Sequence, residues 1–220
     1  MNPNPAGSPQ QYPAGGPSPY AAPPAYAQPQ PGGYAQPQPG AYAQPGAPAP
    51  AAAERGKVAT VLLVVSTVLV GLMAGLFFAF DVSVMPGLAA GDERTYVTAM
   101  QNFNSAIDGN GLFGMAFVLA LLASVASAIV EFRKGRRGVA IWVGVAAVAY
   151  LVVLMITFSV NIPLNNELAD AGDAAKLTDF DIVDKFKGAW VSTNIVRTLL
   201  CTVALTALSR ALVLYGRATR

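Results

Sequence analysis

Four long apolar runs occupy most of the chain after residue 57, and shorter polar segments separate them. The runs are Val58–Phe80, Leu112–Phe132, Val139–Val160 and Trp190–Tyr215. Each reaches the length of roughly 20 residues that an α-helix needs to cross a hydrocarbon core. The pattern therefore predicts an all-α membrane protein whose domain, residues 56–216, is a bundle of four transmembrane helices in a lipid bilayer.

The segment before the first run has a different composition. Residues 1–53 contain no charged side chain, and they hold all of the chain's 17 prolines except Pro86 and Pro163. A repeat occurs at Tyr26–Gly32 (YAQPQPG), at Tyr34–Gly40 and, shortened, at Tyr42–Gly46. Such a segment buries too little apolar area to offset the entropy of ordering it. We expect residues 1–55 to be a disordered, proline-rich tail, either simply solvated or recruiting a cytoplasmic partner through its prolines and tyrosines.

The basic residues favour one side of the predicted bundle. Eight flank the first span, form the link between spans two and three, or end the chain: Arg55, Lys57, Arg133, Lys134, Arg136, Arg137, Arg217 and Arg220. The other two links hold four, mixed with acids: Arg94, Lys176, Lys185 and Lys187. The positive-inside rule then predicts a multi-pass protein of the cell membrane with both termini in the cytoplasm. The formal net charge of +2 is too small to indicate nucleic-acid binding.

Polar side chains gather at the opposite, extracytoplasmic ends of the spans. They are Asp81, Asn102, Asn104, Asn161, Asn165, Asn166, Trp190, Asn194 and Arg197. Trp190, Asn194 and Arg197 follow the spacing i, i+4, i+7, which places them on one face of a helix. If the protein has a binding site, we expect it to open on this side.

Each of these residues also has a purely structural interpretation. Arg197 faces the bundle interior or snorkels to the outer headgroups, because an ionised side chain in hydrocarbon is costly. Asn161 and Asn165 flank Pro163, so their amides either cap a kinked helix or bind a ligand. Trp190 alone would be typical of the interfacial aromatic belt.

Residue types that hold metals and cofactors are scarce. The chain contains no histidine and one cysteine, Cys201, and it has no glycine-rich phosphate loop. We therefore expect neither a metal nor a cofactor.

Four stretches, in this order, resemble the anthrone oxygenase-like family of small membrane proteins. They are Ala74–Leu88 (AGLFFAFDVSVMPGL), Met100–Ile107 (MQNFNSAI), Thr157–Leu168 (TFSVNIPLNNEL) and Trp190–Arg197 (WVSTNIVR). The resemblance covers about residues 58–215 and leaves out the tail. It implies a four-helix membrane bundle and, in the characterised branch, cofactor-free oxygenation of a polycyclic anthrone to a quinone.

The resemblance also suggests roles for the polar residues. The catalytic donors that would stabilise a developing anion are Arg197, Asn194, Asn161 and Asn165. Trp190 would stack on the substrate, and Asn104 and Asp81 would help to bind it. Asp81 is the one acid that the sequence places near this cluster, so no convincing general base is predicted.

A second class of function fits the same residues. The alternative is a non-enzymatic membrane protein that binds a lipid or small ligand, or that anchors partners through its tail. A channel or transporter is disfavoured, because four spans without repeated broken helices or a ring of acids give no obvious pore.

Overall fold

The structure is a computed structural model that describes residues 50–219, with side chains from Gly56 onward. These residues belong to one compact unit, Gly46–Arg220. Residues 1–49 of the predicted tail lie outside the described part of the chain. The disorder of the tail and its cytoplasmic partner therefore stay predictions.

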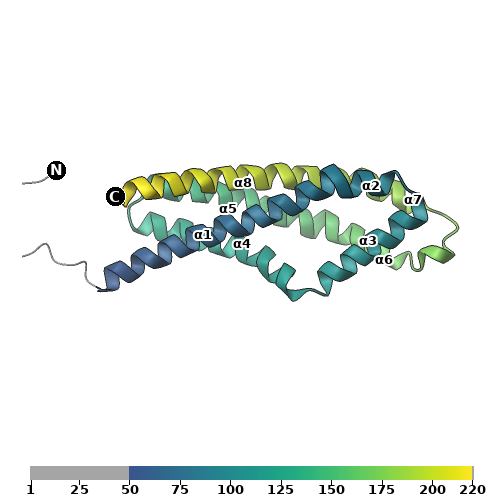
Figure 1. The fold of residues 1–220 in the computed structure, drawn as a ribbon, viewed down its shortest axis with the longest axis horizontal. Helices are drawn as coiled ribbons and strands as arrows, with labels where there is room; N and C mark the ends of the chain where they lie inside the picture. Colours follow the sequence, from purple (N-terminus) through teal and green to yellow (C-terminus); the bar gives the residue numbers. More distant parts are fainter. Residues whose placement is uncertain (1–49, 220) are drawn as a thin grey trace, which may run out of the picture. The chain divides into compact units, whose positions relative to one another are not determined.

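The described chain is built of helices, several of which join end to end (Figure 1). In chain order they are α1 (Pro50–Ala79), η1 (Phe80–Val84), α2 (Met85–Ala89), α3 (Glu93–Asp108), α4 (Gly111–Arg133), α5 (Arg137–Ile156), η2 (Thr157–Asn161), α6 (Ile162–Asp170), η3 (Ala174–Lys176), α7 (Asp181–Lys185), η4 (Phe186–Trp190) and α8 (Val191–Ala218). The segments η1, η2 and η4 are π-helical turns, and η3 is a short 3₁₀ helix.

Four helices are long and apolar enough to cross a membrane, which confirms the predicted all-α bundle with four spans. They are Gly56–Ala89, Gly111–Arg133, Arg137–Asp170 and Asp181–Ala218. Figure 1 shows α1, α4, α5 and α8 running side by side, and each packs on two of the others. Fully buried small residues such as Ala120, Ala146 and Ala204 let the helix backbones approach closely, as in other membrane bundles.

The outward-facing surface of this bundle is apolar. Leu72, Leu122, Met155 and Leu199 are each more than half exposed. In water such a surface would be a liability, whereas in a bilayer it is the ordinary solvent-facing surface. We therefore treat the protein as a multi-pass membrane protein.

Three of the four helices are longer than the predicted spans. The helix α4 has 23 residues, about 35 Å at 1.5 Å per residue, which matches one bilayer. The other three have 34 to 38 residues, about 51–57 Å, and extend past α4 at one end. Hydropathy marks only the lipid-facing part of each helix, so it could not reveal these extensions.

The extensions and α3 bury a second apolar cluster, which we call the cap cluster. It contains Met85, Tyr96, Val97, Met100, Leu164, Leu168, Ala174, Val183, Phe186 and Trp190. Val97 and Met100 are fully buried on α3, and Asp92 caps the N-terminus of this helix by accepting a hydrogen bond from the Thr95 N–H at 2.9 Å. Hydrogen bonds from Thr95 hold the pKa of the Asp92 carboxyl below its usual value.

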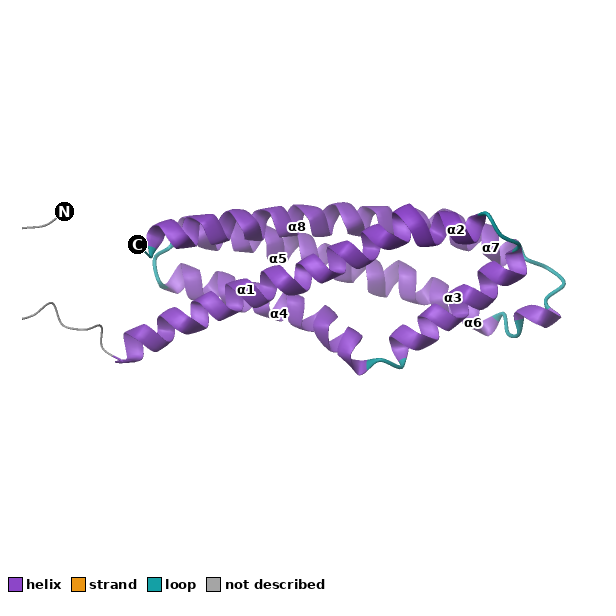
Figure 2. Cartoon of the chain, in the orientation of Figure 1, coloured by secondary structure: helices purple, strands orange, loops and turns teal. Residues whose placement is uncertain are grey.

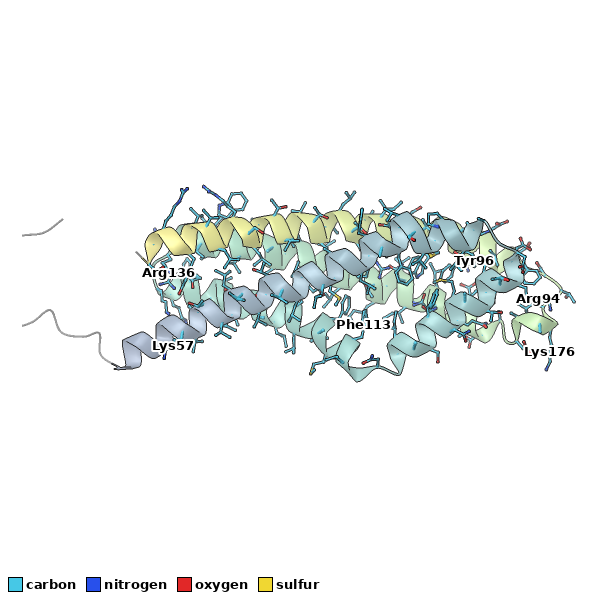
Figure 3. All side chains as sticks on the ribbon, viewed as in Figure 1. Lys57, Arg94, Tyr96, Phe113, Arg136 and Lys176 are labelled. Carbon is cyan, nitrogen blue, oxygen red and sulfur yellow. The ribbon has the colours of Figure 1, made fainter. Side chains whose placement is uncertain are left out.

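The two ends of the bundle can be followed in Figures 2 and 3. We call the end that carries α3 the cap end; Arg94 and Lys176 lie there, and the Arg94 guanidinium donates to the Ala175 carbonyl at 2.6 Å. The opposite end, which carries the start of α1 and the end of α8, is called the terminal end. Lys57 and Arg136 lie at the terminal end (Figure 3).

A buried carboxylate orders the turn between α4 and α5 at the terminal end. Glu131 is fully buried and accepts two hydrogen bonds from the Arg136 guanidinium, one of them 2.8 Å long. The same guanidinium lies 4.9 Å from the centre of the Tyr215 ring on α8. The hydrogen bonds to Glu131 raise the pKa of Arg136.

Candidate functional site

A cavity of about 290 Å³ lies inside the bundle, next to the cap cluster. Side chains from α1, η1, α3, α4, η2, α6, η4 and α8 line it. Six of the predicted site residues are among them: Arg197, Asn194, Asn161, Asn165, Trp190 and Asn104. Polar residues that are up to 93 positions apart in the sequence (Asn104 to Arg197) therefore share one cavity.

Arg197 faces the interior of the bundle and does not snorkel to the headgroups. Only 4% of the residue is exposed. Its Nη2 donates to Asn194 Oδ1 at 2.7 Å, and its Nη1 donates to Thr157 Oγ1 at 3.3 Å. The guanidinium carbon lies 4.4 Å from the centre of the Phe77 ring and 5.3 Å from that of Trp190, so cation–π attraction adds to these hydrogen bonds.

The Asn194 amide bridges Asp81 and Arg197 by hydrogen bonds. The Asn194 amide donates to the Asp81 carboxylate and, at 3.0 Å, to the Phe77 carbonyl, while its oxygen accepts from Arg197. Thr198 donates to the other oxygen of Asp81. Asp81 does not line the cavity, so it contacts Asn194 behind the cavity wall rather than the cavity space.

The two asparagines around Pro163 face the fourth helix. Asn161 Nδ2 donates to Thr193 Oγ1 at 3.0 Å, and Asn165 Oδ1 accepts from the Trp190 indole N–H at 2.9 Å. Pro163 directly follows the π turn η2 in the first turn of α6, and the helix continues beyond it to Asp170. The hydrogen bond from the indole N–H to Asn165 fixes the plane of the Trp190 ring on the cavity wall.

Two buried polar atoms of residues that line the cavity have no hydrogen-bond partner among the described residues. They are Arg197 Nε, a donor, and Asn161 Oδ1, an acceptor. Asn161 is 1% exposed, so water at the surface cannot satisfy its oxygen. Buried polar groups are nearly always hydrogen-bonded, so these are the two atoms of the site that most need a further partner.

The π-helical turns lie where the site residues are. Asp81 lies in η1, Thr157 and Asn161 in η2, and Trp190 at the end of η4. A π turn accommodates one extra residue within an α-helix, which changes the side-chain spacing inside the turn. The rest of each helix follows ordinary α-helical spacing. The inserted residues therefore set which polar side chains point into the bundle at the depth of the cavity.

Sequence reasoning missed several residues that line the cavity. Its apolar wall includes five phenylalanines: Phe77, Phe80, Phe113, Phe117 and Phe158. Thr157 is also part of the wall, and its hydroxyl both accepts from Arg197 and donates to the Val153 carbonyl at 2.8 Å. Asp108, an exposed residue at the end of α3, is the acid that lines the cavity. The phenylalanines had no distinguishing signal, because apolar residues occur on every face of a transmembrane helix.

Comparison with known proteins identifies the region that contains most of this cavity. The family model described as anthrone oxygenase matches residues 103–207. Over these residues the chain is similar to the anthrone oxygenase family. No curated protein and no solved structure matches it.

The matched region begins in α3 and ends in α8. It includes Asn104, Asn161, Asn165, Trp190, Asn194 and Arg197. Asp81 and the phenylalanines of the first helix lie outside it. The polar part of the cavity wall is therefore almost entirely within the matched region, and the first helix completes the site.

Proposed function

We propose that the protein oxygenates an apolar polycyclic aromatic compound of the anthrone class in this cavity, without a cofactor. The observation that carries the proposal is the unpartnered Arg197 Nε–H and Asn161 Oδ1 on a wall otherwise rich in phenylalanine. A flat aromatic ligand fits such a wall; a ketone oxygen on it would accept from Arg197 Nε–H, and a hydroxyl would donate to Asn161 Oδ1. The family match supports the chemistry.

The proposed reaction begins with loss of a proton from the acidic CH₂ of the anthrone. The resulting phenolate-like anion passes an electron to O₂, and the two radicals combine as a peroxide at that carbon. Loss of water gives the quinone, so one anthrone and one O₂ yield one quinone and one water. Arg197 stabilises the anionic oxygen, because a preformed charged donor in a dry site lowers the free energy of a developing anion.

Three asparagines and Trp190 complete the proposed site. Asn194 orients the Arg197 guanidinium, Asn161 and Asn165 hold the fourth helix and the indole ring, and Asn104 borders the substrate. Asp108 lines the cavity and is the carboxylate that we propose as proton acceptor. Asp81 assists through Asn194 and not by direct contact.

A binding function without catalysis is the second candidate. It is favoured by the position of Asp108, which is exposed and lacks the burial that would tune it as a base. Arg197 Nε–H and Asn161 Oδ1 would then bind a lipid-like or aromatic ligand, which would be released without chemical change.

The distribution of basic residues supports a proposed orientation in the cell membrane. Among the described basic residues, those of the α4–α5 turn and of the last turn of α8 lie at the terminal end. The positive-inside rule then places both termini in the cytoplasm and the cap end outside. The proline-rich tail would then meet cytoplasmic partners.

The test is turnover by the purified full-length chain in lipid nanodiscs with 9-anthrone and O₂, measured as anthraquinone formation. We expect Arg197→Gln to lower the rate at least ~100-fold, the magnitude seen when an oxyanion donor is removed. Arg210→Gln is the matched control, because Arg210 is an exposed arginine on the same helix. A wild-type rate equal to that of empty nanodiscs, together with tight binding of anthraquinone, would replace the oxygenase by the binding function.

A further inference from the structure

One stretch of the cavity wall reaches the surface of the bundle. Most of the polar wall is buried, as Asn161 and Arg197 show. Val118 and Phe158 line the same cavity, yet they are 43% and 57% exposed. Gly114, Gly111, Asp108 and Asn110 are exposed residues of the wall as well. The cavity therefore opens along a strip that begins at the turn between α3 and α4 and includes Gly114, Val118 and Phe158.

The opening lies between α4 and the π turn of the third helix. Gly111, Gly114 and Val118 follow the spacing i, i+3, i+7 and occupy one face of α4. Phe158 belongs to η2, and its ring centre lies 6.4 Å from that of Phe117 on α4. The two helices thus approach each other at this aromatic contact. Gly111 and Gly114 lie on α4 between the contact and the α3–α4 turn.

The surface around the opening is apolar. On α4, Met115 and Leu122 are more than half exposed, and on α5 Met155 is 60% exposed. The mean hydropathy of the α4 span, 2.4, is that of a lipid-facing helix. The exposed polar residues of the wall, Asp108 and Asn110, lie at the turn between α3 and α4. The part of the opening at Gly114, Val118 and Phe158 lies on the apolar surface that faces the hydrocarbon.

Gly114 keeps this opening wide at a cost in helix stability. A Cβ at residue 114 would meet no atom within 4 Å, so neither close packing nor a positive φ requires glycine there. Glycine inside a helix is nevertheless less favourable than any residue with a side chain other than proline. Glycine at residue 114 leaves the space beside the helix unobstructed.

We propose that the ligand of this cavity enters laterally from the bilayer, through the opening between α4 and η2, and passes Gly114 on the way in. The proposal rests on the proposed function only in naming the ligand as an apolar aromatic molecule. Such a molecule partitions into the hydrocarbon and reaches the cavity without crossing water. The buried Arg197 and Asn161 then select those membrane-dissolved molecules that carry an oxygen.

A photoreactive lipid tests the route. The full-length chain is placed in nanodiscs with a phosphatidylcholine that carries a benzophenone on its acyl chain, a probe that stays in the bilayer. On illumination the excited ketone takes a hydrogen from a C–H bond that it touches, and the two carbon radicals join, so the ketone becomes an alcohol. Adducts are located by mass spectrometry. We expect them on Phe113 and Ile162, half-buried residues of the cavity wall, as well as on the lipid-facing Leu72.

Two variants and a soluble probe decide the outcome. Gly114→Leu should reduce the cavity adducts at least five-fold and leave those on Leu72 unchanged, which also shows that the bundle is intact. Gly75→Leu is the matched control: Gly75 is an exposed helical glycine with open space around its Cβ, and it does not line the cavity. Cavity adducts that persist in Gly114→Leu, or that form only with water-soluble benzophenone-4-sulfonate, overturn lateral entry. Anthrone turnover is not measured here, so failure of the oxygenase proposal would be seen separately.

Discussion

Arg197 can remain buried because partners meet its charge from several sides. Asn194, Thr157 and two aromatic rings contact the guanidinium directly, and Asp81 supplies the opposite charge one residue further away. A neutral amide between two charges transmits their attraction while both keep hydrogen bonds. The three residues Asp81, Asn194 and Arg197 thus form a net neutral group inside the membrane.

This arrangement predicts that Asp81 and Arg197 are coupled although they do not touch. Asp81→Asn should destabilise the protein by about 1–3 kcal/mol, because it leaves the positive charge of Arg197 uncompensated. In an Arg197→Gln background the same change should cost much less. Thermal unfolding of the four forms in detergent gives the coupling free energy, and additive effects would show that Asn194 transmits no interaction.

A second prediction concerns the buried carboxylate at the terminal end. Arg136→Gln should destabilise the bundle by about 1–3 kcal/mol, since it leaves Glu131 charged, buried and without its cation. Arg133→Gln, a change at an exposed arginine in the same turn, is the matched control. The double change Glu131→Gln and Arg136→Gln should recover most of the loss. A loss equal to that of the control would mean that the pair contributes little.

At the scale of elements, the sequence predicts the helices but not their irregularities. Long apolar runs are sufficient to identify four spans, because lipid requires every backbone group to be paired within the helix. The inward face of the fourth helix also follows from the spacing of Trp190, Asn194 and Arg197. The π turns have no comparable signature, since one inserted residue leaves hydropathy unchanged. Thr157, which lies in η2, was missed for this reason. Asp81 was expected in the site, and it lies behind the cavity wall.

The π turn η2 provides an element-level prediction. A π turn accommodates one extra residue within the helix, so its removal gives an ordinary α-helical turn. Deleting Ser159, an exposed residue of η2, should therefore leave Asn161 and Asn165 on the cavity wall and keep ligand binding. Ser159→Ala, which retains the residue count, should also bind normally. Loss of binding by the deletion variant alone, with the helical circular dichroism kept, would show that the helix beyond η2 rotates when the inserted residue is removed.

At the scale of the whole molecule, the site depends on helices of unequal length. The short α4 ends near the cavity, whereas the other three helices continue into the cap cluster with α3. Because of this difference, the cavity is bordered by polar residues at the α3–α4 turn, near the interface. Its apolar opening lies further toward the centre of the bilayer. A bundle of four equal helices would have closed the space with side chains, as the core does further down around Leu63 and Leu208.

The orientation of the molecule decides which leaflet supplies the cavity, and it can be measured directly. Ala175→Cys at the cap end and Ala218→Cys at the terminal end introduce exposed thiols without changing any charge, and the native Cys201 is buried. We expect a membrane-impermeant maleimide to label Ala175→Cys on intact cells and Ala218→Cys only after permeabilisation. The reason is the concentration of basic residues at the terminal end, which resists transfer across the membrane. The reverse labelling pattern would put the opening of the cavity in the cytoplasmic leaflet and the terminal end outside.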